Sequence, residues 1–389
     1  MRCITYASLL FIVFASCGQE SEDVAFMRGD CILIDNADPN IIQDVSDHFE
    51  LTTIPLDKEW SASMEYLNDF AFLDSLLILV GNSRVILGVD LSGEFLWRIA
   101  ANEDERLGLG NFGNLIIDYE RQLFAVESRM ENTFFWFDMS GEFVKKEPQP
   151  LYANSRAYLG ENKSVYDIYN MQQEGSPHPE SSYDLVFLDH ETSELSFWNR
   201  GADIFRRKIY ASAGPNFVEG KDEIFYLKSF NDTVYSIQDK YAKYEFCFRF
   251  STGDRSWIYK ADPSIETSIL SYFIDNDISY ARYFLPIGEK YFGGYRSSKG
   301  YIGYIADMVG NELVNSKFWK IDEYVISAPW SVRGGYFIGL DYNYEVEFLQ
   351  QKAEEGKLTM DIYQSGEMES LQDRYGDYQP ATIFLLKVK

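Results

Sequence analysis

Histidine is nearly absent from this chain of 389 residues, which contains only His48, His178 and His190. No two of them have a spacing that would place both on one metal ion or beside one nucleophile. The sequence also lacks the Gly-x-Ser-x-Gly motif of a nucleophile elbow. We therefore expect no histidine zinc site and no histidine-based nucleophile, we assign no catalytic residue, and we predict no cofactor.

Basic residues are few as well: 35 Lys and Arg stand against 61 Asp and Glu, for a net charge of −26 at pH 7. A field of this sign repels phosphate backbones and anionic headgroups, so we expect no nucleic-acid partner. Acidic polymers are excluded too, unless a basic patch reverses the sign locally. The densest acidic clusters, Asp35–Asp38 and Asp275–Asp277, do not match the Asp-x-Asp-x-Asp-Gly pattern of a calcium loop. We interpret them as turns or helix ends and predict no metal site.

Cysteine is scarce, with four in the chain. Cys3 and Cys17 lie in the N-terminal segment, so only Cys31 and Cys247 could pair in the body of the protein. A disulfide is chemically permitted outside the cytoplasm, but cysteines so far apart in sequence give no geometric support for one. We expect two unpaired, buried thiols, with a disulfide as the alternative.

The N-terminal segment has the three parts of a secretory signal: the basic Arg2, the apolar run Ile4–Phe14 and two small residues. The run is too short to cross a bilayer, which takes about 20 apolar residues. Phe14–Cys17 resembles the bacterial lipobox, in which the cysteine sulfur receives a diacylglycerol before cleavage, although Leu is usual in place of Phe. We predict that residues 1–16 are removed and that Cys17 becomes the lipid-bearing first residue. A plain signal peptide is the alternative.

Residues 17–50 are predicted to be a tether and lead-in. Gly18–Asp23 is polar and acidic, so it cannot bury apolar surface and should be flexible. In surface lipoproteins of some Gram-negative bacteria, an acidic stretch after the lipidated cysteine directs display on the outer face, and Gln19–Asp23 resembles such a stretch. A plain linker is the alternative. We predict an outer-membrane lipoprotein of the cell envelope, anchored to the membrane through the lipid on Cys17.

Aromatic residues are abundant, with 28 Tyr and 29 Phe, and they alternate with polar residues in short runs. This is the period of half-buried strands. Tyr244–Phe250, for example, places four aromatic residues on one face. Similar runs lie at 76–80, 85–89, 123–126, 134–137, 185–188 and 224–227. Helical periodicity is confined to Pro263–Phe273 and to parts of Val346–Asp373.

A sequence repeat is the most informative feature. Asp90–Phe95, Asp-Leu-Ser-Gly-Glu-Phe, recurs as Asp138–Phe143, Asp-Met-Ser-Gly-Glu-Phe, at an offset of 48 residues. In both copies a strand runs into the Asp, and Ser-Gly makes a tight turn before the next strand. Weaker copies follow around Asp189 and Asp239. A unit of about 50 residues with several strands has the size of a propeller blade.

We predict an all-β, six-bladed β-propeller over residues 51–389, with small helical insertions and with seven blades as the alternative. The long stretches Gly253–Tyr280 and Asp341–Pro380 are expected to be helical or irregular insertions. The sixth blade combines both ends of the domain, which removes open sheet edges. The blades are expected at 63–102, 113–147, 154–200, 217–250 and 281–320, with the sixth assembled from 323–340, 381–389 and 51–56.

Several segments together resemble a family: Phe72–Leu79, the two Asp-x-Ser-Gly-Glu-Phe turns, Phe230–Tyr235 and the closing Gln379–Lys389. Over roughly residues 51–389 they resemble the bacterial lipoproteins described as six-bladed β-propellers of unknown function. That family often has Gly-x-Gly-Pro-Gly-Glu between its first two blades, whereas Gly108–Gly113 lacks the Pro and Glu. Because Gly108–Gly113 precedes a strand, we interpret it as a crossing between blades. The resemblance implies a fold and no activity.

In a propeller, the loops between second and third strands share one rim with the loops between blades. This rim is expected to carry Arg84, Arg106, Arg129 and Arg296. Converging arginines could bind carboxylates or sugar hydroxyls; ordinary turn solvation and salt bridges are the alternative.

The lack of a recognisable catalytic set favours a binding or scaffolding module, with a glycan, a peptide or another envelope protein as ligand. The alternative is a polysaccharide-active hydrolase or lyase whose site lies in the central channel. A third hypothesis is that the propeller only stabilises a larger complex.

Overall fold

The computed structural model describes most of the chain from Cys31 to Lys389. The described residues are 31–56, 60, 64, 67–81, 84–101, 103, 107, 112–128, 131, 133–151, 153, 155–160, 162–168, 183–200, 216–219, 223–227, 233–251, 279–307, 310–329, 331–375 and 380–389. The predicted signal peptide and Cys17 lie outside them, as do Arg106, Arg129, Asp275–Asp277 and the helix expected at Pro263–Phe273.

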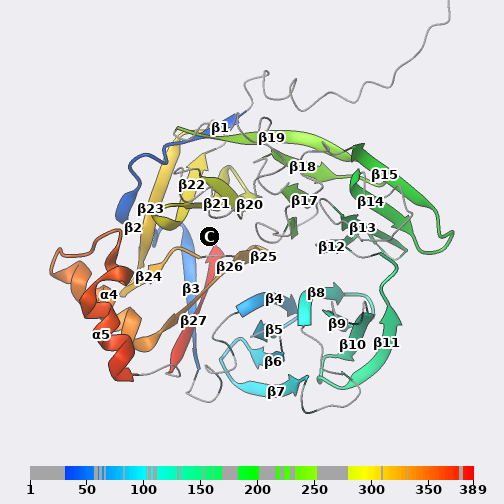
Figure 1. Ribbon diagram of the computed structural model, residues 1–389, viewed down its shortest axis with the longest axis horizontal. Helices are drawn as coiled ribbons and strands as arrows, with labels where there is room; N and C mark the ends of the chain where they lie inside the picture. The colour runs from blue at the N-terminus through cyan, green and yellow to red at the C-terminus, as the bar shows by residue number, and fades with distance from the viewer. Residues whose placement is uncertain are drawn as a thin grey trace, which may run out of the picture.

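Six sheets, each with four antiparallel strands that form a blade, stand in a ring around a central axis, and in each the first strand is innermost (Figure 1). This confirms the predicted all-β, six-bladed propeller. Blade 1 is β4(Leu67–Leu73), β5(Leu76–Gly81), β6(Val85–Asp90) and β7(Phe95–Ala100); blade 2 is β8(Phe112–Asp118), β9(Leu123–Ser128), β10(Thr133–Asp138) and β11(Phe143–Pro148); blade 3 is β12(Ser155–Tyr158), β13(Lys163–Asp167), β14(Tyr183–Asp189) and β15(Leu195–Arg200). Blade 4 is β16(Phe217–Glu219), β17(Ile224–Leu227), β18(Thr233–Ile237) and β19(Ala242–Phe250); blade 5 is β20(Tyr280–Ile287), β21(Lys290–Ser297), β22(Gly300–Asp307) and β23(Glu312–Ile321).

Blade 6 joins the two ends of the domain, as expected. Its strands are β25(Ser331–Arg333), β26(Tyr336–Tyr342), β27(Ala381–Val388) and β3(Phe49–Leu56). The N-terminal strand β3 pairs antiparallel with the C-terminal strand β27 along its whole length. One boundary was wrong: β24(Tyr324–Ser327), expected in the sixth blade, pairs with β23 and extends the sheet of blade 5.

The lead-in before blade 6 is more ordered than the sequence indicated. β1(Cys31–Ile34) pairs parallel with β19, and β2(Asn40–Asp44) pairs parallel with β23. Figure 1 shows this blue segment running along the outside of blades 4 and 5 before it enters blade 6 as β3. We call residues 31–56 the N-terminal belt. It adds an outermost strand to three successive blades.

A disulfide joins the belt to blade 4. Cys31 and Cys247 are register partners in the β1–β19 pair, with Cα atoms 4.4 Å apart, and their sulfurs are bonded. The expectation of two unpaired thiols was therefore wrong. The separation falls in the range of about 4.4–6.8 Å that a disulfide can bridge. It could not be foreseen, because the pairing of β1 with β19 was not predicted.

The acidic cluster at the start of the belt forms a turn that fixes it to the ring. The Asp35 carboxylate accepts hydrogen bonds from the Ala37 amide (3.2 Å) and the Ser251 hydroxyl (2.8 Å). The Asn36 amide group donates to the Ser279 hydroxyl over 2.8 Å. These side chains hold the belt between blades 4 and 5.

The repeated turns connect the third and fourth strands of blades 1 and 2. Asp138 accepts hydrogen bonds from the Ser140 hydroxyl (2.6 Å) and from the amides of Ser140 (2.9 Å) and Glu142 (3.0 Å). The hydroxyl bond is the main cause that lowers the pKa of Asp138, ahead of the opposing effect of burial. Gly141 has a φ of 79°, which explains the glycine of the repeat.

Each repeated turn also docks against the neighbouring blade. Trp97, on β7 of blade 1, donates from its indole nitrogen to the Met139 carbonyl over 2.8 Å. A Cβ added at Gly141 would lie only 2.8 Å from the Trp97 ring. In the same way, a Cβ at Gly93 would lie 3.2 Å from Ile54 on β3 of blade 6. The glycines of the repeat therefore permit close contact between blades.

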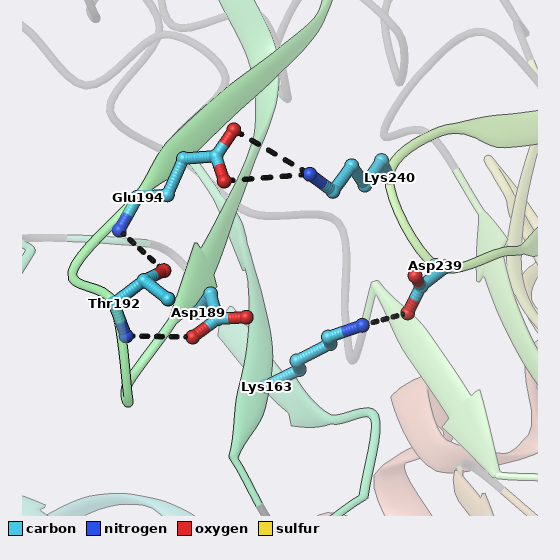
Figure 2. Close-up of polar contacts among 6 residues, drawn as sticks. All are labelled: Lys163, Asp189, Thr192, Glu194, Asp239 and Lys240. Atoms are coloured by element: carbon cyan, nitrogen blue, oxygen red, sulfur yellow. Dashed lines mark hydrogen bonds and ion pairs between the residues drawn. The ribbon is translucent and has the colours of Figure 1, made fainter.

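Blades 3 and 4 meet at the corresponding turns through ion pairs (Figure 2). Lys163 pairs with Asp239 at 2.6 Å, and Lys240 pairs with Glu194 at 3.4 Å. All four side chains are substantially exposed, so water and salt screen both pairs. These exposed pairs therefore add little to the contact between blades 3 and 4.

The insertion expected between Asp341 and Pro380 is helical. It contains α4(Asn343–Glu354), the 3-10 turn η5(Ile362–Gln364) and α5(Gly366–Tyr375), which pack their apolar side chains onto β23 and β24. In Figure 1 these helices lie outside the ring beside β24. No helix among the described residues is long and apolar enough to cross a membrane.

The docking of the repeated turn predicts a difference between two glycine variants. Gly141→Ala and Gly310→Ala both place a side chain at positive φ (79° and 86°), which costs roughly 1–2 kcal/mol. Only Gly141→Ala also meets Trp97, whose ring is fixed by its hydrogen bond to Met139, because nothing lies within 4 Å of a Cβ at Gly310. We expect Gly141→Ala to lower the free energy of unfolding by about 1–3 kcal/mol more than Gly310→Ala, measured by urea denaturation. Equal losses would contradict the docking role.

Candidate functional site

A cavity of about 1030 Å³ opens at one end of the central channel. It lies at the upper end of the roughly 300–1,000 Å³ usual for ligand pockets. Five of the six blades contribute to its lining, each through the turn between its first and second strands and through residues of the adjoining strands. These turns supply Tyr119, Glu120 and Arg121 from blade 2, Gly160 and Asn162 from blade 3, Glu223 from blade 4, Gly288 from blade 5, and Gly334 and Gly335 from blade 6.

This is the opposite end of the ring from the predicted arginine rim. Arg84 lies just before β6 and is exposed, and Arg296 lies near the end of β21; neither lines the cavity. Arg296 donates a hydrogen bond to the Tyr301 hydroxyl over 3.2 Å and its guanidinium lies 5.1 Å from that ring. Arg106 and Arg129 lie outside the described residues. The arginine rim stays a prediction, separate from the cavity.

Two basic side chains of the cavity are already paired with carboxylates that also line it. Arg121 lies 3.5 Å from Asp118, and Lys145 lies 2.8 Å from Glu147. Burial tends to raise the pKa of Glu147, but the hydrogen bond and charge of Lys145 outweigh it and the pKa is lowered. Glu147 is therefore ionised at neutral pH. Four of the charged side chains that line the cavity thus form ion pairs with one another.

A stacked arginine supports the wall of the cavity between blades 2 and 3. The Arg156 guanidinium lies 4.3 Å from the Tyr158 ring centroid, 4.9 Å from that of Phe134 and 5.0 Å from that of Tyr166. Cation–π contacts of this kind are worth about 0.5–2 kcal/mol each, more where water is excluded. Burial raises the pKa of Tyr158, so its phenol stays neutral. Arg156 thus fixes Tyr158, which lines the cavity, in one orientation.

His190 is held on the same wall by three contacts. Its backbone amide donates to the Asn162 carbonyl over 2.6 Å, and its Nε2 lies 2.5 Å from the Ser164 hydroxyl and 3.3 Å from Arg156. Burial first, and then the positive charge of Arg156, lower the pKa of His190. The imidazole is therefore neutral at pH 7, so it offers one hydrogen-bond donor and one acceptor.

The contact between Ser164 and His190 has the spacing of a nucleophile and its base, but it cannot serve that purpose. Ser164 is fully buried, and its hydroxyl also accepts a hydrogen bond from Arg156 over 2.9 Å. A substrate carbonyl has no access to this oxygen. Among the described residues, no group of three or more His, Cys, Asp or Glu could hold a metal ion. The contact is structural.

The residues of the cavity were missed by reasoning from the sequence. The predicted arginine rim lies at the other end of the ring, and Tyr119, Tyr158 and His190 belong to no motif. One signal was available: Gly160, Gly288 and the pair Gly334–Gly335 recur between first and second strands and take positive φ. A Cβ at any of these glycines would meet no atom within 4 Å, so they leave the mouth of the cavity open.

Two solved structures are similar to this chain to different degrees. A protein from Bacteroides fragilis NCTC 9343, provisionally described as exported, is 12% identical, and the match covers 92% of this chain and 99% of that one with a TM-score of 0.62. A member of the DUF4221 family from Bacteroides vulgatus is 9% identical, with coverage of 88% and 99% and a TM-score of 0.48. No curated protein matches the sequence.

The likeness to the B. fragilis protein shows a common fold. A family model described as a 6-bladed beta-propeller, DUF5128, matches residues 27–289, which is more than half of the chain. This confirms the resemblance to a family of six-bladed β-propellers. The chain belongs to the DUF5128 family of six-bladed β-propellers.

Proposed function

We propose that the protein is a binding module of the cell envelope and that its ligand occupies the cavity at the end of the channel. The observation that carries this proposal is a large cavity lined by turns of five blades. Each of those turns is anchored in a sheet, so the cavity is formed before a ligand arrives. Preorganisation of this kind lowers the entropic cost of binding.

Binding is favoured over polysaccharide cleavage by the state of the two cavity carboxylates that form ion pairs. A glycosidase needs a carboxylic acid whose pKa is raised enough to donate a proton near neutral pH. The pKa of Glu147 is instead lowered, chiefly through Lys145 acting against burial, and Asp118 is paired with Arg121. These two carboxylates are suited to accept hydrogen bonds from a ligand.

The envelope location is proposed from the N-terminus. Residues 1–16 have the features of a signal peptide, and Cys17 follows a lipobox-like segment. A disulfide between Cys31 and Cys247 fits an oxidising compartment. We propose an outer-membrane lipoprotein held by the lipid on Cys17.

Substitution of the lipidation site tests the anchor. We expect Cys17→Ala to remove the protein from the outer-membrane fraction of bacteria that express the full chain, because no lipid can then be attached to hold it there. The Cys3→Ala variant, which keeps the lipidation site and the disulfide, is the control and should stay in the outer-membrane fraction. An undiminished amount of Cys17→Ala in the outer-membrane fraction would contradict lipid anchoring.

The binding role is tested with the chain from Ser21 onward, screened against glycan and peptide libraries for binding and turnover. We expect binding without turnover, and we expect Tyr119→Ser to weaken it by at least about fivefold, since a stacked aromatic ring contributes roughly 0.5–1.5 kcal/mol and its hydroxyl adds a hydrogen bond. Tyr241→Ser is the matched control, because Tyr241 is 53% exposed against 52% for Tyr119 but does not line the cavity. Equal affinities of the two variants would contradict the site, and turnover would favour the hydrolase or lyase.

A further inference from the structure

We propose that the ligand of the cavity is a neutral oligosaccharide; this inference rests on the binding role proposed above. Its first support is the charge of the lining. Arg121 and Lys145 are each neutralised by a carboxylate within the cavity, so they do not converge on an external anion. The strong negative charge of the whole chain, −26, also disfavours anionic ligands.

Positive ligands are not well matched either. The two lining carboxylates outside the ion pairs, Glu120 and Glu223, are exposed and lie on blades 2 and 4. Lys387 adds a third basic side chain to the lining, so four acidic residues face three basic ones. A cationic peptide would be repelled by Lys387, and only Glu120 and Glu223, which lie on separate blades, could attract it. The near balance of acidic and basic residues in the lining favours an uncharged ligand.

The second support is the kind of hydrogen-bonding group that the wall offers. The Asn162 amide and the phenols of Tyr119 and Tyr158 each carry both a donor and an acceptor, and the ring of His190 adds its Nδ1, since its Nε2 contacts Ser164 and Arg156. A sugar hydroxyl also donates and accepts, so it can satisfy such groups whichever way they are oriented. The carboxylate of Glu147 adds an acceptor that is held in place by Lys145.

The third support is the shape of the cavity and its apolar parts. Tyr119 is about half exposed at the mouth of the cavity. Tyr336 lines the side formed by blade 6, where the centroid of its ring lies 4.4 Å from that of Phe72. Aromatic faces suit the C–H faces of sugar rings, which are polar only at their edges. The open glycine turns and the volume of about 1030 Å³ leave room for several linked rings.

Calorimetric titration of the chain from Ser21 onward tests the inference. The probes are neutral gluco-, manno- and xylo-oligosaccharides, oligouronides of the same lengths, and acidic and basic peptides. We expect a neutral oligosaccharide to bind, with an affinity that changes by less than about twofold between roughly 0.05 and 0.5 M NaCl, because no net charge is being screened. Tyr119→Ser should weaken that binding and Tyr241→Ser should not.

The outcomes separate this inference from the binding role itself. One outcome is that no neutral sugar binds, whereas an oligouronide or a charged peptide does, with an affinity that Tyr119→Ser lowers and that falls roughly tenfold at high salt. The cavity would then be a binding site, but the inference would be wrong. If none of the probes binds in a way that depends on Tyr119, both the inference and the binding role fail.

Discussion

Closure of the ring by the N-terminal belt is the constraint on which the rest of the structure depends. Six sheets can bury their faces only if the last meets the first, and β3 achieves this by pairing with β27. Two further strands of the belt hold it to the ring, because β2 pairs with β23 and β1 pairs with β19. The disulfide between Cys31 and Cys247 adds a covalent link between the start of the belt and blade 4.

Closure also holds the inner strands together around the channel. Arg333 on β25 lies 3.5 Å from the Asp69 carboxylate of blade 1 and donates to the carbonyls of Phe70 (3.3 Å) and Leu115 (3.4 Å). Asp69 accepts in turn from the Leu115 amide of blade 2 over 2.7 Å. Three blades thus meet at one largely buried ion pair. Since the cavity is built from turns of five blades, it keeps its shape only while these contacts hold the ring closed.

Much of the fold was predictable because short stretches of sequence specify its turns and strands. The Asp90–Phe95 and Asp138–Phe143 turns have a defined hydrogen-bonding pattern and a required positive φ, so they reveal the period of the blades. The belt was not predictable, because pairing between β1 and β19 joins residues 216 positions apart and leaves no periodic signal. The cavity was missed for a similar reason: its side chains come from turns of different blades, and no single turn carries a motif.

Urea unfolding with and without a reductant tests ring closure most directly. The account predicts one cooperative transition in the oxidised protein and a free energy of unfolding that falls by about 4 kcal/mol on reduction, because a very long loop is released. The double variant Cys31→Ser/Cys247→Ser should resemble the reduced protein and should not respond to reductant. Identical unfolding of the oxidised and reduced protein would contradict the claim that the disulfide secures the belt and, through it, the ring.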